Sequence, residues 1–165
     1  MMKPWNNRSD IEAALFNPAF CGELILHAVS SYNKTAKQGK FPYALAFLVL
    51  PFLMNEVVYK ALPSTKRTGL ITWLFSNQHL TPLIANKIKE LKGYTNEAIL
   101  FDLSMNLLQI DEQAGLETGS SKLIRKRYFQ RNEVENMIKR AGFIGVWLGE
   151  AGDVVTIFSL IGITV

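Results

Sequence analysis

The sequence predicts a mainly α-helical α+β fold, in which a helical domain includes a winged-helix-like segment. Apolar residues recur at helical spacing along most of the chain. Two short strand-like runs are joined by a turn at Ala114 and Gly115. A length of 165 residues suits one domain that buries a sizeable core. We therefore expect a single domain, 1–165, with an N-terminal helical part (1–62), a winged-helix-like part (67–119) and a C-terminal helical part (132–165).

Two helices are expected near the N-terminus, and each begins at a capping signal. Ser9 and Glu12 have the spacing of a capping box, which predicts a short first helix. Asn17 is the expected N-cap of the second helix, because Pro18 follows it and proline suits the first turn of a helix. The second helix then has one apolar face, formed by Cys21, Leu24, Ile25, Ala28, Val29 and Tyr32.

The next segment, 44–61, fits two interpretations. It is either a helix kinked at Pro51, or a buried strand followed by a helix with Pro51 in its first turn. We favour the helix.

The middle of the chain has the element order of a winged helix, which is three helices followed by a β-hairpin. The second of these helices is expected to begin with Thr81 as its cap and Pro82 at its first position, and to end at Gly93. The expected elements are helices over 67–77, 80–91 and 95–108 and a hairpin over 107–119.

The C-terminal part begins with a helix expected over 132–152. Gly142, Gly145 and Gly149 recur about once per turn, which permits another backbone to approach closely. Asp153 is a candidate cap for a last helix, although the β-branched residues of 154–160 also suit a strand.

Charge is segregated along the chain. Residues 60–92 contain six basic residues and one acid, whereas 93–119 contain five acids and no Lys or Arg. The acidic third helix and hairpin would be repelled by DNA, which argues against use of that surface on nucleic acid. The basic stretch 122–131 is a candidate patch for nucleic acid or an acidic partner, and its alternative is a solvated linker. Its basic residues are Lys122, Arg125, Lys126, Arg127 and Arg131.

Little in the sequence indicates catalysis. Cys21 and His27 are six residues apart and point to different sides of their helix, so they cannot form a thiolate–imidazole pair. Glu23 and His27 share a face, but two ligands are too few for a metal. The sequence contains no phosphate-binding loop and no serine elbow, and its carboxylates are scattered or surface-like. We expect no enzyme activity and no cofactor.

The composition favours a cytoplasmic protein without a membrane span. The most apolar uncharged run, 43–54, is shorter than a bilayer requires and contains Pro51. The first residues lack the apolar core of a signal peptide, and one cysteine suits a reducing compartment.

Several stretches of the sequence resemble the middle components of prokaryotic three-component ABC systems. The resemblance is carried in order by "WNNRSDIEAALFNPAFCGELILHAVSSY", "LAFLVLPFLM", Leu62-Pro63 followed by "LITWL", "NEAILFDLSMNLLQI" and "GVWLGEAGDVVTIFSLIGI". It covers nearly the whole chain. The motifs are packing patterns rather than chemical ones, and the ending "IGITV" lacks the Arg-Pro-like finish of the family.

The resemblance implies a non-catalytic adaptor between an ABC-type ATPase and an effector protein, in bacterial systems associated with conflict with phages or plasmids. The ATP site would then belong to the partner. Candidate partner contacts are Trp5, Asn6, Arg8 and Val165. The alternative function is a stand-alone winged-helix protein that binds DNA through 122–131, and an adaptor could also contact nucleic acid weakly.

Overall fold

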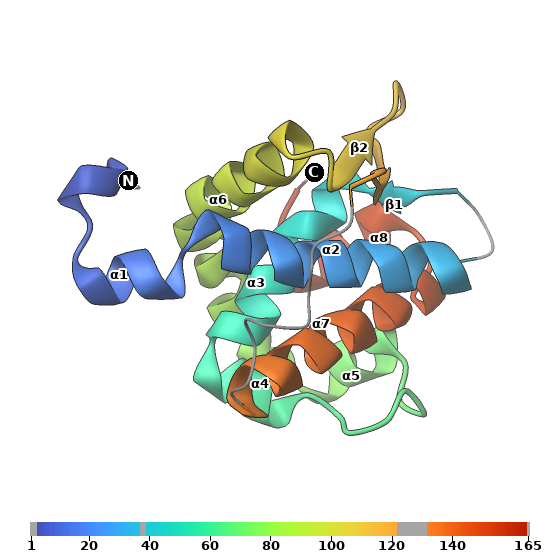
Figure 1. Cartoon of the computed structure of the whole chain (residues 1–165). Helices are drawn as coiled ribbons and strands as arrows, with labels where there is room; N and C mark the ends of the chain where they lie inside the picture. Colours follow the sequence, from blue (N-terminus) through green and yellow to red (C-terminus); the bar gives the residue numbers. More distant parts are fainter. Residues whose placement is uncertain (1–2, 37–38, 122–131, 165) are drawn as a thin grey trace.

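The structure is a computed structural model that describes residues 3–36, 39–121 and 132–164. It is mainly helical with one small antiparallel sheet, as the sequence predicts. The N-terminal segment projects from one end of the helical body (Figure 1).

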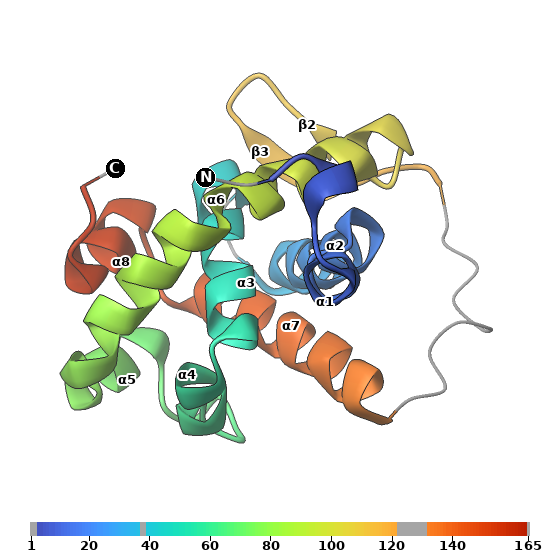
Figure 2. The ribbon, with the colours of Figure 1, turned by 90° about the vertical axis from the view of Figure 1, so that its left-hand side faces the viewer.

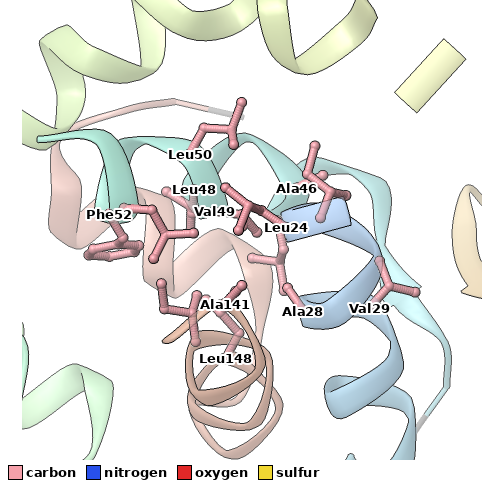
Figure 3. Packing of buried hydrophobic residues seen from close by; sticks show 14 of the residues in the cluster. Leu24, Ala28, Val29, Ala46, Leu48, Val49, Leu50, Phe52, Ala141 and Leu148 are labelled. Carbon is pink, nitrogen blue, oxygen red and sulfur yellow. The ribbon is translucent and has the colours of Figure 1, made fainter. Parts of the chain in front are cut away.

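Helix α2 (Pro18–Thr35) forms the centre of the molecule. Asn17 caps it as predicted, and its side-chain oxygen accepts a hydrogen bond from the Ala19 N–H at 2.9 Å. The predicted apolar face is buried against α3, α6 and α7. Side chains from α2, α3 and α7 meet in this core, and Figure 3 labels Leu24, Ala28, Val29, Ala46, Leu48, Val49, Leu50, Phe52, Ala141 and Leu148.

The segment after α2 confirms the helical interpretation of 44–61. The 3-10 turn η2 (Tyr43–Leu45) leads into α3 (Ala46–Met54), which contains Pro51 in its interior. The chain breaks at Asn55, whose side chain caps α4 (Glu56–Ala61). The helical alternative is therefore correct, but the interruption lies at Asn55 and not at Pro51, where the kink was expected.

The three-helix order expected for a winged helix is wrong. Helix α5 (Leu70–Ser76) and the 3-10 turn η3 (Gln78–Leu80) are followed by one continuous helix, α6 (Thr81–Ser104), that runs through Gly93. Thr81 is already helical and does not cap α6. A glycine inside a helix costs only about 1 kcal/mol, and the two residues after Gly93 are buried, so packing keeps the helix intact.

The predicted hairpin is present, and an unpredicted strand joins it. Strands β2 (Leu108–Ile110) and β3 (Gly115–Thr118) pair antiparallel, and β1 (Phe41–Pro42) pairs with the other edge of β3. The Asn33 side chain on α2 donates to Leu116 O at 2.9 Å and accepts from Phe41 N at 2.8 Å. One amide therefore fixes two strands to the central helix.

Helix α7 (Asn132–Glu150) packs along α2, and its glycines make the close approach that the sequence predicts (Figure 1). A Cβ atom at Gly145 would lie 2.1 Å from the carbonyl oxygen of Ala28. At Gly142 it would lie 3.1 Å from the hydroxyl of Ser31. The glycine spacing thus lets the two helix backbones meet.

The end of the chain is helical rather than extended. Helix α8 (Val154–Ile161) is capped by Asp153, as predicted for the helical alternative, and ends at Gly162 with a left-handed φ of 83°. It packs against α6 and α5. Figure 2 shows α8 on one side of α6 and the N-terminal segment on the other.

Candidate protein interface

The first candidate interface is the N-terminal arm, which we define as residues 3–16. It comprises the 3-10 turn η1 (Trp5–Asn7) and helix α1 (Asp10–Leu15). The Ser9 hydroxyl accepts from Glu12 N at 3.2 Å, so the predicted cap is confirmed. Since the arm projects from the body, its attachment depends on a few specific contacts.

Arg8 is the main anchor of the arm. Its guanidinium forms a bidentate pair with Glu97 on α6, at 2.9 and 3.0 Å, and its Nε donates to Lys3 O at 3.1 Å. The guanidinium carbon lies 5.0 Å from the ring centre of Trp5 and 5.2 Å from that of Tyr94. The hydrogen bond to Glu97 raises the pKa of Arg8 above its ordinary value. Paired and sandwiched in this way, a guanidinium can be buried without a large penalty.

A second contact between the arm and α6 surrounds Tyr94. Its hydroxyl donates to the carboxylate of Glu12, and its ring stacks on Phe16 with centroids 4.4 Å apart. Burial and the hydrogen bond to Glu12 raise the pKa of the Tyr94 hydroxyl to about 12. The same hydrogen bond lowers the pKa of Glu12. The arm is therefore held by ionic and aromatic contacts on one side.

The arm also exposes three apolar side chains. Trp5 is 46% exposed, and Ile11 and Leu15 are 73% and 50% exposed. Ile11 and Leu15 are four residues apart, so they lie on one face of α1. Exposed apolar groups on a firmly anchored projection are typical of protein contacts.

The second candidate interface is a groove of about 500 Å³ between η2, α3, α6 and α8. Apolar side chains form most of it, and the Tyr43 hydroxyl donates to the Asn96 side chain at 2.8 Å at its edge. We call this site the C-terminal groove. Its lining residues are Tyr43, Ala44, Phe47, Ile88, Lys89, Lys92, Asn96, Phe158, Ile163 and Thr164.

Three of the six basic residues in the block over 60–92 are neutralised by nearby acids. Lys60, Lys66 and Lys87 pair with Glu56, Glu150 and Glu90. Within the described part of the chain, the remaining basic residues of the block, Arg67, Lys89 and Lys92, form no ion pair. Two of these three line the C-terminal groove.

The acidic block over 93–119 does not form a free surface. Glu97 pairs with Arg8, while Asp111 and Glu117 pair with Lys40 at 3.4 and 2.8 Å. Asp102 is buried. Most acids of this block are therefore paired or buried within the chain.

Two carboxylates that the sequence suggests are surface groups are buried in the core. Glu23 on α2 is 2% exposed and lies 2.9 Å from the Nε2 atom of His27. Asp102 on α6 is 1% exposed and lies against the backbone of Gly22, where a Cβ atom would meet its carboxylate at 2.4 Å. Burial, and secondarily the charge of Glu23, raise the pKa of Asp102 to about 7.

Sequence reasoning missed these carboxylates because their burial depends on the packing of α2 against α6. The only local signal was Gly22, which removes the side chain that would otherwise occupy the position of the Asp102 carboxyl. Cys21 is buried as expected, and burial raises the pKa of its thiol to about 12. His27 is 21% exposed in its side chain, so it faces solvent only in part.

The candidate contact residues from the sequence have different environments. Trp5 and Asn6 are exposed on the arm, whereas Arg8 is directed inward to Glu97. Trp5 is thus available to a partner, and Arg8 positions the arm. The basic patch and the C-terminal residue lie outside the described residues, namely Lys122, Arg125, Lys126, Arg127, Arg131 and Val165.

The described residues also bear on metal binding and on membrane insertion. Over 3–36, 39–121 and 132–164, no group of three or more His, Cys, Asp or Glu side chains is placed to hold a metal ion. By length and hydropathy alone, Asp10–Thr35 qualifies as a candidate membrane span, and α7 with α8 would qualify as one bent span. The central helix of a compact domain meets the same criteria, and α2 packs against α3, α6 and α7.

Comparison with known proteins identifies a family. The family model described as ABC-three component (ABC-3C) system Middle Component 3 matches residues 5–165. Searches of curated proteins and of solved structures gave no match.

Proposed function

Because this chain belongs to the ABC-three component (ABC-3C) system Middle Component 3 family, we propose that it is a non-catalytic adaptor in such a system. It would link an ABC-type ATPase to an effector protein in a bacterial conflict or anti-phage defence system, and act in the cytoplasm. The observation that carries the proposal is the family match, which covers the arm from Trp5 onward and all residues that line the C-terminal groove. ATP hydrolysis would be the task of the partner.

The arrangement of the two candidate interfaces supports an adaptor. A middle component needs at least two surfaces that can be occupied together. The arm contacts α6 through Tyr94 and Glu97, whereas the groove uses Lys89, Lys92 and Asn96 of the same helix. At 100° per residue the mean directions of these sets lie roughly 140° apart around α6. Figure 2 shows the corresponding segments, α1 and α8, on opposite sides of α6.

The environment of the most perturbed carboxyl group also supports a non-catalytic role. Asp102 has a pKa near neutrality, which is often found at active sites. Its side chain is covered by α2, however, and it lines neither the C-terminal groove nor the arm. A carboxyl group in that position is part of the core packing and is not placed to contact a substrate.

Affinity purification from the native host tests this proposal. A tagged chain should recover an ABC-type ATPase and a third component in stoichiometric amounts, identified by mass spectrometry. Recovery of the chain alone, repeated at low salt and after crosslinking, would overturn the adaptor. The basic stretch 122–131 would then be tested for DNA binding, with the five basic residues neutralised as the control.

A further inference from the structure

We propose that the C-terminal groove binds an acidic amphipathic helix of a partner protein. The floor would take the apolar side chains of that helix, and Lys89 and Lys92 would pair with its carboxylates. The inference relies on the proposed function only for the source of the helix.

The chemistry of the groove favours an apolar occupant with acidic groups. Its floor presents aromatic and aliphatic side chains, among them Phe47, Ile88 and Ile163. Its only charged lining residues are Lys89 and Lys92, and among the described residues neither has an ionic partner. An open apolar surface bordered by unpaired positive charge is complementary to an apolar segment flanked by carboxylates.

The elements around the groove favour a helix over an extended peptide. A peptide that binds as an added strand needs an exposed strand edge for backbone hydrogen bonds. The groove is lined by helices, the η2 turn and the two residues after Gly162, and β1 does not contribute to it. Recognition must then come from side chains, as when an amphipathic helix lies in a groove with anchors at i, i+3, i+4 and i+7.

The distribution of charge along the sequence agrees with this assignment. Three of the six basic residues of 60–92 are used in ion pairs with nearby acids, such as Lys87 with Glu90 on α6. Lys89 and Lys92 are the exceptions on that helix, and both point to the same groove. An acidic partner would supply carboxylates that none of the described residues places in the groove.

Fluorescence anisotropy with two labelled model peptides tests the groove directly. Each peptide is about 18 residues long, enough for five helical turns, with leucines at helical spacing. One has glutamates at the remaining positions, and the other has lysines. The wild-type chain at low ionic strength should bind the glutamate peptide roughly tenfold more tightly than the lysine peptide.

Variants separate the groove from general charge attraction. The double variant Lys89→Glu/Lys92→Glu should reverse the preference and bind the lysine peptide more tightly. The matched variant Lys34→Glu/Arg67→Glu changes the net charge equally at exposed positions outside the groove and should keep the wild-type preference. Ala44→Trp should fill the groove and weaken binding of both peptides.

Three outcomes would overturn the proposal. They are no binding of either peptide, equal binding of both, or a glutamate preference that survives Lys89→Glu/Lys92→Glu. Circular dichroism spectra that match the wild type establish that each variant is folded. The peptide assay needs only this chain, so it tests the groove separately from the adaptor role. Loss of peptide binding with recovery of an ATPase would overturn the groove proposal alone. Peptide binding without recovery of an ATPase would overturn the adaptor proposal alone.

Discussion

At the scale of single residues, the buried carboxyl group of Asp102 makes the stability of this chain depend on pH. Its pKa is raised to about 7 in the folded chain, above the ordinary value of 3.8. Between these two values the unfolded chain has lost the proton and the folded chain retains it. The folded state therefore binds more protons, and the free energy of unfolding falls as the pH rises through this window.

The substitution Asp102→Asn tests this dependence. The wild-type free energy of unfolding should fall between about pH 4 and pH 7, and the Asn variant should lose most of that slope. At pH 8 the variant should be more stable than the wild type by on the order of 1–3 kcal/mol, because no buried charge remains. The free energy of unfolding at each pH is measured by urea denaturation, which is monitored through the fluorescence of the buried Trp73 and Trp147.

Glu112→Gln is the control for this experiment, since it removes an exposed carboxyl group from the tip of the hairpin. It should leave the pH profile close to that of the wild type. An Asn variant of Asp102 with an unchanged profile would show that another group causes the dependence.

Whether the role of a residue could be predicted from the sequence depended on how far along the chain its interaction partner lies. Ser9, Asn17 and Asp153 were predicted correctly because a cap is satisfied within three residues of itself. The role of Arg8 could not be predicted, since its partner Glu97 is 89 positions away. A local sequence pattern contains no information about that pairing.

At the scale of elements, the contact between α2 and α7 depends on one glycine more than on its neighbours. A methyl group at Gly145 would be forced against the backbone carbonyl of Ala28, at 2.1 Å. At Gly142 it would meet only the hydroxyl of Ser31, at 3.1 Å, and that side chain can rotate. Both sites are on α7, so a Gly→Ala substitution changes the helix propensity by the same amount at each.

Gly145→Ala should therefore lower the free energy of unfolding by about 1–3 kcal/mol, because the helices must move apart. Gly142→Ala should change it by less than about 1 kcal/mol, since alanine also favours the helix. Thermal unfolding of the two variants in parallel measures the difference. Equal effects at both positions would mean that the close approach of α2 and α7 does not depend on position 145.

The elements also show where sequence patterns gave the wrong boundaries. The spacing of Gly142, Gly145 and Gly149 correctly indicated a close helix contact, because that signal is periodic. Gly93 was misread as the end of a helix, because the packing of Tyr94 and Thr95 outweighs its low propensity. Strand β1 is only two residues long and depends on Asn33 and β3 for its existence, so no local pattern predicted it.

At the scale of the whole molecule, the arm and the C-terminal groove lie on opposite sides of α6, so two partners could bind at once. If each surface serves one component, damage to one should remove one partner and leave the other. Of the two interfaces, the sequence indicated Trp5 and Asn6 as possible contacts on the arm and showed that charge is unevenly distributed along the chain. Their positions depend on how α1 and α8 pack on α6.

The double variant Ile11→Ser/Leu15→Ser tests the arm. Both side chains are at least 50% exposed, so the free energy of unfolding should change by less than about 1 kcal/mol. In the native host purification, this variant should recover one component at a much lower yield and the other at the wild-type yield. Lys89→Glu/Lys92→Glu should show the complementary loss.

Val57→Ser/Val155→Ser is the matched control, because these side chains are 57% and 62% exposed on α4 and α8, outside both surfaces. It should recover both components at wild-type yields. Full recovery of both components by the arm variant would mean that the apolar face of α1 is not an interface. Loss of both components by either variant alone would indicate that the partners bind one continuous surface, and the separation across α6 would then have no role in assembly.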